Sequence, residues 1–253
     1  MTPSRLELWW LRRRPAPLDI LTPAMQWGRF QTWINAVLKR TELRQARHRA
    51  RQIYEPLLTR LKGSRSYQQS DRIGRFAHHI LHSHLPTPVR YLEIGALEGY
   101  SVAFVHTLLE GKVLITVVDP FIDFLELANT NMSQVFATFS ANIDAIGAKN
   151  SVRVLKGRSI DHLPKLVDAG EQFDLIYIDG SHAILDVMLD AVLGWQLLAR
   201  GGLMIFDDYW YRRPDLGRSF RPKLAVDAFV GAMSHEIDVI DVAGQAFIRK
   251  KPL

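Results

Sequence analysis

The chain has 253 residues, of which 47% are hydrophobic and 23% are charged, and this balance excludes a fibrous repeat and a wholly disordered chain. It contains no cysteine, which excludes disulfide bonds, thiolate metal sites and cysteine nucleophiles. The net charge of +6 is unevenly distributed, because residues 1–90 carry 17 Lys and Arg against 5 Asp and Glu, whereas residues 91–253 carry 15 against 21. The two parts have opposite charge, and we expect them to have different roles.

The first part of the chain has the pattern of a basic extension. Four prolines lie within residues 1–25 and predict an irregular arm, since proline lacks the backbone N–H that a regular helix uses. Apolar residues then recur at three- and four-residue steps from Trp27 to Leu61 and from Asp71 to His84, which predicts two helical segments. We therefore predict a basic, mainly helical extension over residues 1–70 and a second domain over residues 71–253.

The extension also bears on location and partners. The apolar run Trp9–Leu11 is followed directly by three arginines and does not resemble a secretion signal, and no apolar run in the chain approaches the roughly 20 residues of a membrane-spanning helix. Together with the absence of cysteine, this favours a cytoplasmic protein. The arginine-rich stretch Lys39–Arg51 is most simply a solvated helix face. Contact with an anionic membrane surface or with a partner protein is the alternative, no nucleic-acid-binding motif is evident, and the sequence leaves a homodimer open.

After Pro88 the chain alternates apolar, strand-like runs with helical segments, which is the pattern of a parallel sheet covered by helices on both faces. Near the end, two strand-like runs joined by Ala243-Gly244 predict a hairpin that inserts one antiparallel strand. We therefore predict an α/β fold with a mainly parallel sheet. The predicted strands are Val89–Ile94, Val113–Val118, Val152–Leu155, Leu175–Ile178, Leu203–Phe206, Ile237–Val242 and Gln245–Arg249.

In an open parallel sheet, ligands bind beyond the carboxyl ends of the strands. The first strand ends in a turn that contains Gly95 and Gly99, which lets a ligand approach the backbone N–H groups that open the next helix. The second strand ends at Asp119, where a carboxylate can accept both hydroxyls of a ribose. The glycine spacing differs from the fingerprint of nicotinamide-dependent dehydrogenases. The pattern indicates an adenosine-type ligand, with a tight turn and a surface aspartate as the alternative.

Carboxylates also follow the fourth and fifth predicted strands, at Asp179, Asp207 and Asp208. Side chains at the ends of neighbouring strands lie close together, and unneutralised carboxylates repel one another in a partly desolvated site. Oxygen-rich clusters of this kind bind hard divalent cations such as Mg²⁺. In the alternative interpretation, Asp207 or Asp208 caps the following loop and only one acid faces the cleft.

Between about Leu85 and Lys251 the chain contains, in order, the motifs Glu93–Ser101, Asp119, Gly157–Ser159, Asp179–His182, Leu197–Gly202 and Asp207–Tyr209. Together they resemble the class I S-adenosylmethionine-dependent methyltransferases. Within that superfamily the chain is most similar to the small-molecule O-methyltransferases of the catechol type and the antibiotic-sugar type. The resemblance implies a Rossmann-like, seven-stranded, mostly parallel sheet with a reversed final strand, and S-adenosylmethionine as the methyl donor.

The resemblance assigns roles to individual residues. Asp179, Asp207 and Asp208 match the family's ligands for Mg²⁺ or another divalent cation, and Asp179 also borders the cofactor. Asp119 would accept the ribose hydroxyls, and Ser159 lies where the adenine edge is read. The remaining cofactor-binding positions are Glu93, Gly95 and Gly99 in the loop, with Tyr100 and Ser101 where the family holds the methionine carboxylate.

His182 departs from the family pattern. Catechol-type members have a lysine base three residues after the first metal ligand, where this chain has His182, and sugar-modifying members have an aspartate at the position of Ser181. An imidazole titrates near neutral pH, so His182 can act as a general base beside Asp179, with a role in holding the loop as the alternative. We expect metal-assisted O-methylation of a small hydroxylated acceptor. The alternative function is a non-catalytic S-adenosylmethionine-binding protein that acts through its basic N-terminal helices.

Three further features are interpreted from their pattern. The loop Trp210–Arg213, with Arg218 and Arg221 after it, is expected to overhang the acceptor pocket, and its aromatic and arginine side chains suit a planar, sugar-like or anionic acceptor. The histidines at 78, 79, 82 and 84 are interpreted as an ordinary helix face, with metal binding by the i,i+4 pair His78 and His82 as the alternative. The stripe of Trp27, Phe30 and Trp33 is interpreted as packing.

Overall fold

The computed structural model describes residues 40–63, 70–121, 132–212, 215, 217 and 219–252. The irregular arm predicted over residues 1–25 and the stripe of Trp27, Phe30 and Trp33 lie outside the described residues. Among the described residues, none of the helices combines the length and the hydropathy that crossing a lipid bilayer requires.

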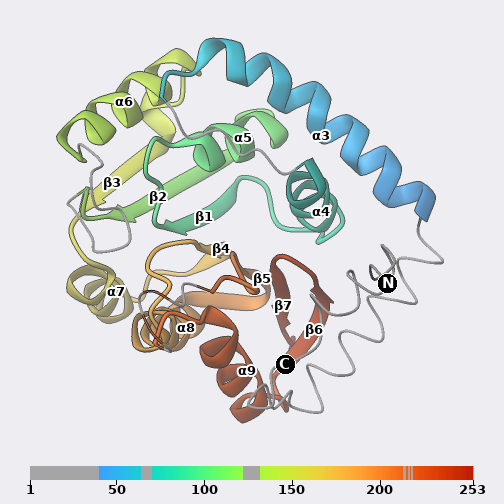
Figure 1. The fold of residues 1–253 in the computed structure, drawn as a ribbon, viewed down its shortest axis with the longest axis vertical. Helices are drawn as coiled ribbons and strands as arrows, with labels where there is room; N and C mark the ends of the chain where they lie inside the picture. The colour runs from blue at the N-terminus through green and yellow to red at the C-terminus, as the bar shows by residue number, and fades with distance from the viewer. Residues whose placement is uncertain are drawn as a thin grey trace, which may run out of the picture.

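A seven-stranded sheet forms the centre of the fold, with the strand order β3-β2-β1-β4-β5-β7-β6 (Figure 1). The first five strands are parallel, and β7 is antiparallel to both β5 and β6. The predicted α/β fold with a reversed final strand is thereby confirmed. The strands are β1 Val89–Ile94, β2 Val113–Asp119, β3 Val152–Lys156, β4 Phe173–Ile178, β5 Leu198–Phe206, β6 Ile237–Val242 and β7 Ala246–Lys250.

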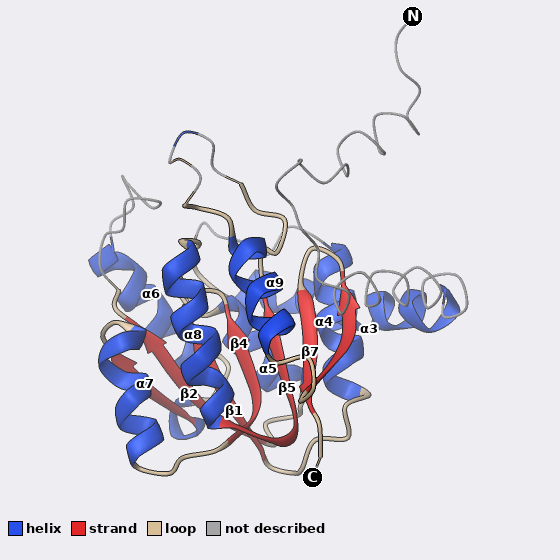
Figure 2. Cartoon of the chain, turned by 90° about the horizontal axis from the view of Figure 1, so that it is seen from below, coloured by secondary structure: helices blue, strands red, loops and turns tan. Residues whose placement is uncertain are grey.

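Helices cover both faces of the sheet (Figures 1 and 2). One layer contains α3 Arg40–Arg60, α4 Ser70–Leu81, α5 Tyr100–Leu108 and α6 Met132–Ala145. The other contains α7 Ser159–Asp168, α8 Ile184–Leu197 and α9 Pro222–Ala232. Because successive strand residues point to opposite faces, neighbours such as Tyr91 and Leu92 enter two separate apolar cores, one under each layer.

The basic helix α3 is amphipathic and packs against α4 and α5. Its apolar side chains at Leu43, Ala50 and Tyr54 are buried, and the ring of Tyr54 meets that of Phe104 edge-on at 6.1 Å between centroids. Its outward face carries exposed arginines at positions 44, 49 and 51. Although α3 precedes the domain boundary predicted at residue 70, it shares its core with the sheet.

Polar contacts connect helix α4 to β6, the strand at one side of the sheet. Arg75 lies 2.5 Å from the Oδ2 atom of Asp241, and the Nε2 atom of His79 lies 2.9 Å from the same oxygen. The rings of His78 and His82 contact each other at 4.3 Å between centroids. Among the residues that the structure describes, the α4 histidines do not join a cluster of three candidate metal ligands.

Two strands start earlier than the apolar runs predicted, β4 at Phe173 and β5 at Leu198. Leu198 pairs with Phe173 and Leu203 pairs with Leu175, so four residues of β5 lie opposite one residue of β4. Gly201, with a φ of 79°, belongs to this bulge within β5.

Candidate active site

The turn after β1 brings the backbone of two loops together. Gly95 has a φ of 85°, and a Cβ atom there would lie only 2.3 Å from the carbonyl oxygen of Asp179 in the loop after β4. Gly99 precedes α5 with a φ of 78°, and no side chain caps the helix. The first backbone N–H groups of α5, from Tyr100 onward, can therefore bind an anionic group such as a carboxylate.

The side chains that follow Gly99 are directed into the protein. The hydroxyl of Tyr100 donates a hydrogen bond to the carbonyl oxygen of Lys62 at 3.2 Å, and the hydroxyl of Ser101 donates to the carboxylate of Glu93. These two residues can still offer their backbone N–H groups to the methionine carboxylate, as the sequence predicts. Their hydroxyls fix the start of α5 against its surroundings.

Glu93 is fully buried at the end of β1. Tyr91 donates a second hydrogen bond to its carboxylate at 2.5 Å. Burial raises the pKa of Glu93 to about 7, the negative charges of Asp119 and Asp207 act in the same direction, and the two hydrogen bonds oppose the shift. Glu93 therefore changes its charge near neutral pH.

Asp119 ends β2 and supports the glycine turn. Its carboxylate accepts hydrogen bonds from the backbone N–H groups of Ala96 at 2.8 Å, Leu97 at 2.9 Å and Phe121 at 2.7 Å. The side chain is buried beside the turn. Its contact with ribose hydroxyls stays a prediction, and the structure adds a role in fixing the loop.

Ser159 is the first residue of α7, whose N-terminus also lacks a side-chain cap. Its hydroxyl hydrogen-bonds to Asp190, an acid in the middle of α8 that is 2% exposed. Burial raises the pKa of Asp190 to about 7, although the hydrogen bond from Ser159 lowers it. The motif analysis missed Asp190, because it follows no strand. The available signal is that it is a single acid within the apolar run Val187–Val192.

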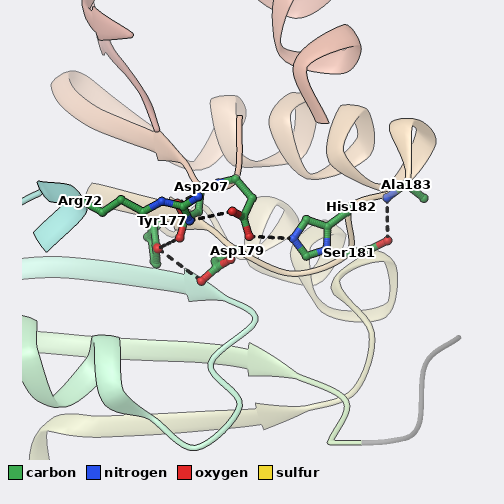
Figure 3. Close-up of polar contacts among 8 residues, drawn as sticks. Arg72, Tyr177, Asp179, Ser181, His182, Ala183 and Asp207 are labelled. Carbon is green, nitrogen blue, oxygen red and sulfur yellow. Dashed lines mark hydrogen bonds and ion pairs between the residues drawn. The ribbon is translucent and has the colours of Figure 1, made fainter. Parts of the chain in front are cut away.

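The acids predicted after β4 and β5 lie at one edge of the sheet but have different partners (Figure 3). The hydroxyl of Tyr177 donates to the Oδ2 atom of Asp207 at 2.6 Å and lies 3.3 Å from Asp179. Arg72 from α4 lies 3.4 Å from Asp207 and 2.6 Å from the Oδ1 atom of Asp208. Tyr177 and Arg72 are absent from the predicted site, because the spacing of the motifs gives no sign of either contact.

His182 lies next to these acids, at the carboxyl ends of the strands. Its Nε2 atom lies 3.1 Å from the Oδ2 atom of Asp208, and its ring stacks on that of Tyr211 at 4.0 Å between centroids. The backbone N–H of Ala183 donates to the hydroxyl of Ser181 at 3.1 Å, so Ser181 supports the turn before α8 (Figure 3). His182 is thereby held between an aromatic ring and a carboxylate.

The pKa values of Asp179 and Asp208 are shifted in opposite directions. Burial raises the pKa of Asp179 well above its usual range, and the negative charges of Asp207, Asp208 and Glu93 raise it further. Burial also raises the pKa of Asp208, but the hydrogen bond from His182 and the positive charge of Arg72 outweigh it, and the net shift is downward. The two neighbouring acids are therefore shifted in opposite directions, with the pKa of Asp179 raised and that of Asp208 lowered.

Asp179, His182 and Asp208 each offer one ligand atom, and these atoms lie within 4.8 Å of one another, so the three residues could hold a cation. The two carboxylates fit a divalent cation on their own, and the imidazole can either join them, which would favour Mn²⁺ or a later transition metal over Mg²⁺, or stay free to accept a proton. Asp207, the third acid of the predicted set, is buried and accepts hydrogen bonds from Tyr177 and from the backbone N–H of Asp208 at 2.8 Å. The structure thus brings His182 into the cluster, and Asp207 lies behind it.

Comparison with known proteins identifies the fold family. Residues 92–209 match the methyltransferase domain family. This stretch contains the glycine turn, the buried acids and His182, in the order that the sequence resemblance requires. The match covers a little less than half of the chain and supports a class I S-adenosylmethionine-dependent methyltransferase.

Two curated relatives of this methyltransferase are named as acting on oxygen. The O-methyltransferase hkm8 of Aspergillus hancockii is 30% identical over 127 residues, which are 50% of this chain and 45% of that protein. A catechol O-methyltransferase of Niastella koreensis is 33% identical over 91 residues, which are 35% of each chain. This chain therefore spans less than half the length of either relative.

Solved structures agree on the fold of this methyltransferase. The O-methyltransferase TomG of Streptomyces achromogenes, solved with SAM, superposes with a TM-score of 0.53 at 17% identity and covers 81% of this chain and 89% of its own. MycE from the mycinamycin biosynthetic pathway, solved with Mg, SAH and mycinamycin VI, gives a TM-score of 0.57 at 15% identity, over 80% of this chain and 53% of its own.

Proposed function

We propose that this methyltransferase transfers the methyl group of S-adenosylmethionine to a hydroxyl oxygen of a small acceptor, with help from a divalent cation. The observation that carries the proposal is the pairing of His182 with Asp208 at 3.1 Å, beside Asp179 and next to the glycine turn after β1. A base is needed because a neutral hydroxyl is a weak nucleophile. The names of the two curated relatives support oxygen as the accepting atom.

The cofactor fits the residues around the glycine turn. The uncapped N-terminus of α5 suits the methionine carboxylate, and the close approach at Gly95 leaves room only for backbone. Asp119 would accept the ribose hydroxyls, and Ser159 at the uncapped start of α7 would meet the adenine. S-adenosylmethionine, when bound, supplies an electrophilic methyl group on its sulfonium.

The proposed proton path uses His182. In this path Nε2 carries the hydrogen and donates it to the carboxylate of Asp208, 3.1 Å away, which leaves Nδ1 to accept the proton of the acceptor hydroxyl. The new oxygen–carbon bond forms as the sulfur–carbon bond breaks, and the proton of the hydroxyl ends on His182. Tyr211 keeps the ring in plane by stacking on it. A divalent cation bound by Asp179 and Asp208 supplies Lewis acidity, which lowers the pKa of a hydroxyl beside it.

The side of the site opposite the cofactor suggests the class of acceptor. Trp210, Tyr211 and Arg212 follow Tyr209, the residue after Asp208, and Trp210 contacts the ring of Tyr209 at 4.8 Å between centroids. Aromatic faces and a guanidinium suit a planar or anionic acceptor. We therefore propose a hydroxylated aromatic or acidic small molecule.

The proposal is tested with His182→Ala in the full chain, and with His235→Ala as the matched control, because His235 is an exposed histidine after α9. Transfer is measured with labelled S-adenosylmethionine and a panel of catechols, phenolic acids and sugars, and Mn²⁺ affinity is measured separately. We expect His182→Ala to lose at least a hundredfold in transfer and to keep its Mn²⁺ affinity.

Two results would contradict the proposal. Loss of Mn²⁺ affinity in His182→Ala would make His182 a metal ligand in place of a base. If wild-type protein gives no heat when titrated with S-adenosylhomocysteine, the methyltransferase function itself is refuted.

A further inference from the structure

An arginine from outside the family match reaches into the candidate site. Residues 92–209 carry the methyltransferase match, whereas Arg72 belongs to α4. Its NH1 atom lies 2.6 Å from the Oδ1 atom of Asp208 and 3.4 Å from the Oδ1 atom of Asp207 (Figure 3). One guanidinium therefore contacts both acids that end β5.

The fold holds this arginine in place from two directions. The ion pairs of Arg75 and His79 with Asp241 fasten the next turns of α4 to β6. The turn between β6 and β7 passes close to the guanidinium at Gly244, where a Cβ atom would lie 3.1 Å from the Nε atom of Arg72. A glycine at this point gives the arginine room to reach the acids.

Arg72 and a bound cation would both contact the carboxylate of Asp208. Asp208 gives its Oδ1 atom to Arg72 and its Oδ2 atom to the cluster with His182 and Asp179. A divalent cation in that cluster shares Asp208 with a fixed positive charge, and like charges at this range repel in a site that is only partly solvated. The side chains of Arg72 and Asp208 are 22% and 24% exposed, so water screens the repulsion only in part.

We propose that Arg72 is a positioning residue that serves as a built-in counter-ion of the acidic edge and weakens the binding of divalent cations there. The acids then stay paired when no cation is bound, and the cation exchanges readily. This inference rests on the metal-assisted part of the proposed function.

The test is the affinity for Mn²⁺, measured by the electron paramagnetic resonance signal of the free ion with full-length, chelator-treated protein. We expect Arg72→Gln to bind Mn²⁺ at least tenfold more tightly than wild type. Arg153→Gln is the control, because it removes a comparably short guanidinium–carboxylate pair, with Glu171 at 2.5 Å, from β3 instead of α4. It should leave the affinity unchanged.

A second variant covers the case in which Arg72→Gln does not fold. Gly244→Ala crowds the guanidinium without removing its charge, and we expect a smaller increase in affinity in the same direction. Unchanged or weaker Mn²⁺ binding in the variants that fold overturns the proposal, as does the absence of Mn²⁺ binding in wild type and variants alike. Titration of the same samples with S-adenosylhomocysteine tests the methyltransferase function independently.

Discussion

Asp190 makes the stability of the protein depend on pH in a direction that can be predicted. The side chain is 2% exposed, and among the described residues its Oδ1 atom has no hydrogen-bond partner. Burial raises its pKa from 3.8 to about 7 in the folded protein. The unfolded chain releases the proton near the lower value, so the folded state binds more protons between the two values. Stability therefore falls as the pH rises through this range.

The size of the effect follows from the shift. One pKa unit corresponds to roughly 1.4 kcal/mol, so the complete shift costs about 4 kcal/mol, of which about 2 to 3 kcal/mol falls between pH 5 and pH 8. Asp190→Asn removes the titrating group. Its amide still accepts the hydrogen bond from Ser159, and any cost of burying its N–H₂ group is independent of pH.

Urea denaturation at pH 5 and pH 8 tests this reasoning. The unfolding free energy of each protein is measured at both pH values. Relative to wild type, Asp190→Asn should be more stable at pH 8 than it is at pH 5, by about 2 to 3 kcal/mol. Ser159→Ala removes a hydrogen bond that lowers the pKa of Asp190, and it should steepen the pH dependence. Equal pH dependence in Asp190→Asn and wild type would refute the assignment, since other groups such as Glu93 titrate alike in both.

Three further substitutions have predictable outcomes. Gly95→Ala places a Cβ atom 2.3 Å from a backbone oxygen, at a φ of 85°. We therefore expect calorimetry to show at least a tenfold loss of affinity for S-adenosylhomocysteine. Unchanged affinity would show that the turn can adjust to the added methyl group. Tyr177→Phe leaves the Oδ2 atom of buried Asp207 without its donor and should cost about 1 to 3 kcal/mol in urea denaturation, whereas no loss would mean that water replaces the hydroxyl. Lys223→Met removes the cation next to the buried carboxylate of Asp227, which keeps its hydrogen bond from Tyr209, and should cost about 3 to 5 kcal/mol. The double variant Lys223→Met with Asp227→Leu should recover most of this loss.

The sheet could be predicted from sequence because its strands are short apolar runs that local pattern identifies. The predicted bounds of β1 agree with the structure, since four of the six residues of Val89–Ile94 are apolar and the run ends at a glycine turn. The start of β5 was wrong, because the apolar run begins at Leu203, whereas β5 starts with the pair of Leu198 and Phe173, before the bulge at residues 199–202.

The candidate site could be predicted only where its residues end strands. Asp119, Asp179 and Asp208 were identified because parallel strands bring their carboxyl ends to one edge. The contacts that determine their charge depend on packing between distant segments. Arg72 lies 135 positions before Asp207 along the chain, and no local pattern connects the two. Asp190 was missed for the same reason, because its burial follows from the packing of α7 on α8.

The position of α4 has a consequence for how such proteins diversify. The helix lies outside the segment that identifies the family, yet one of its side chains forms ion pairs with the acids at the end of β5. If Arg72 weakens cation binding as proposed, relatives with the same core would differ in metal affinity when their upstream helix carries another side chain at this position. A truncated protein that contains only the segment matched to the family would lack Arg72, and the charge around the acids after β5 would differ from that in the full-length chain.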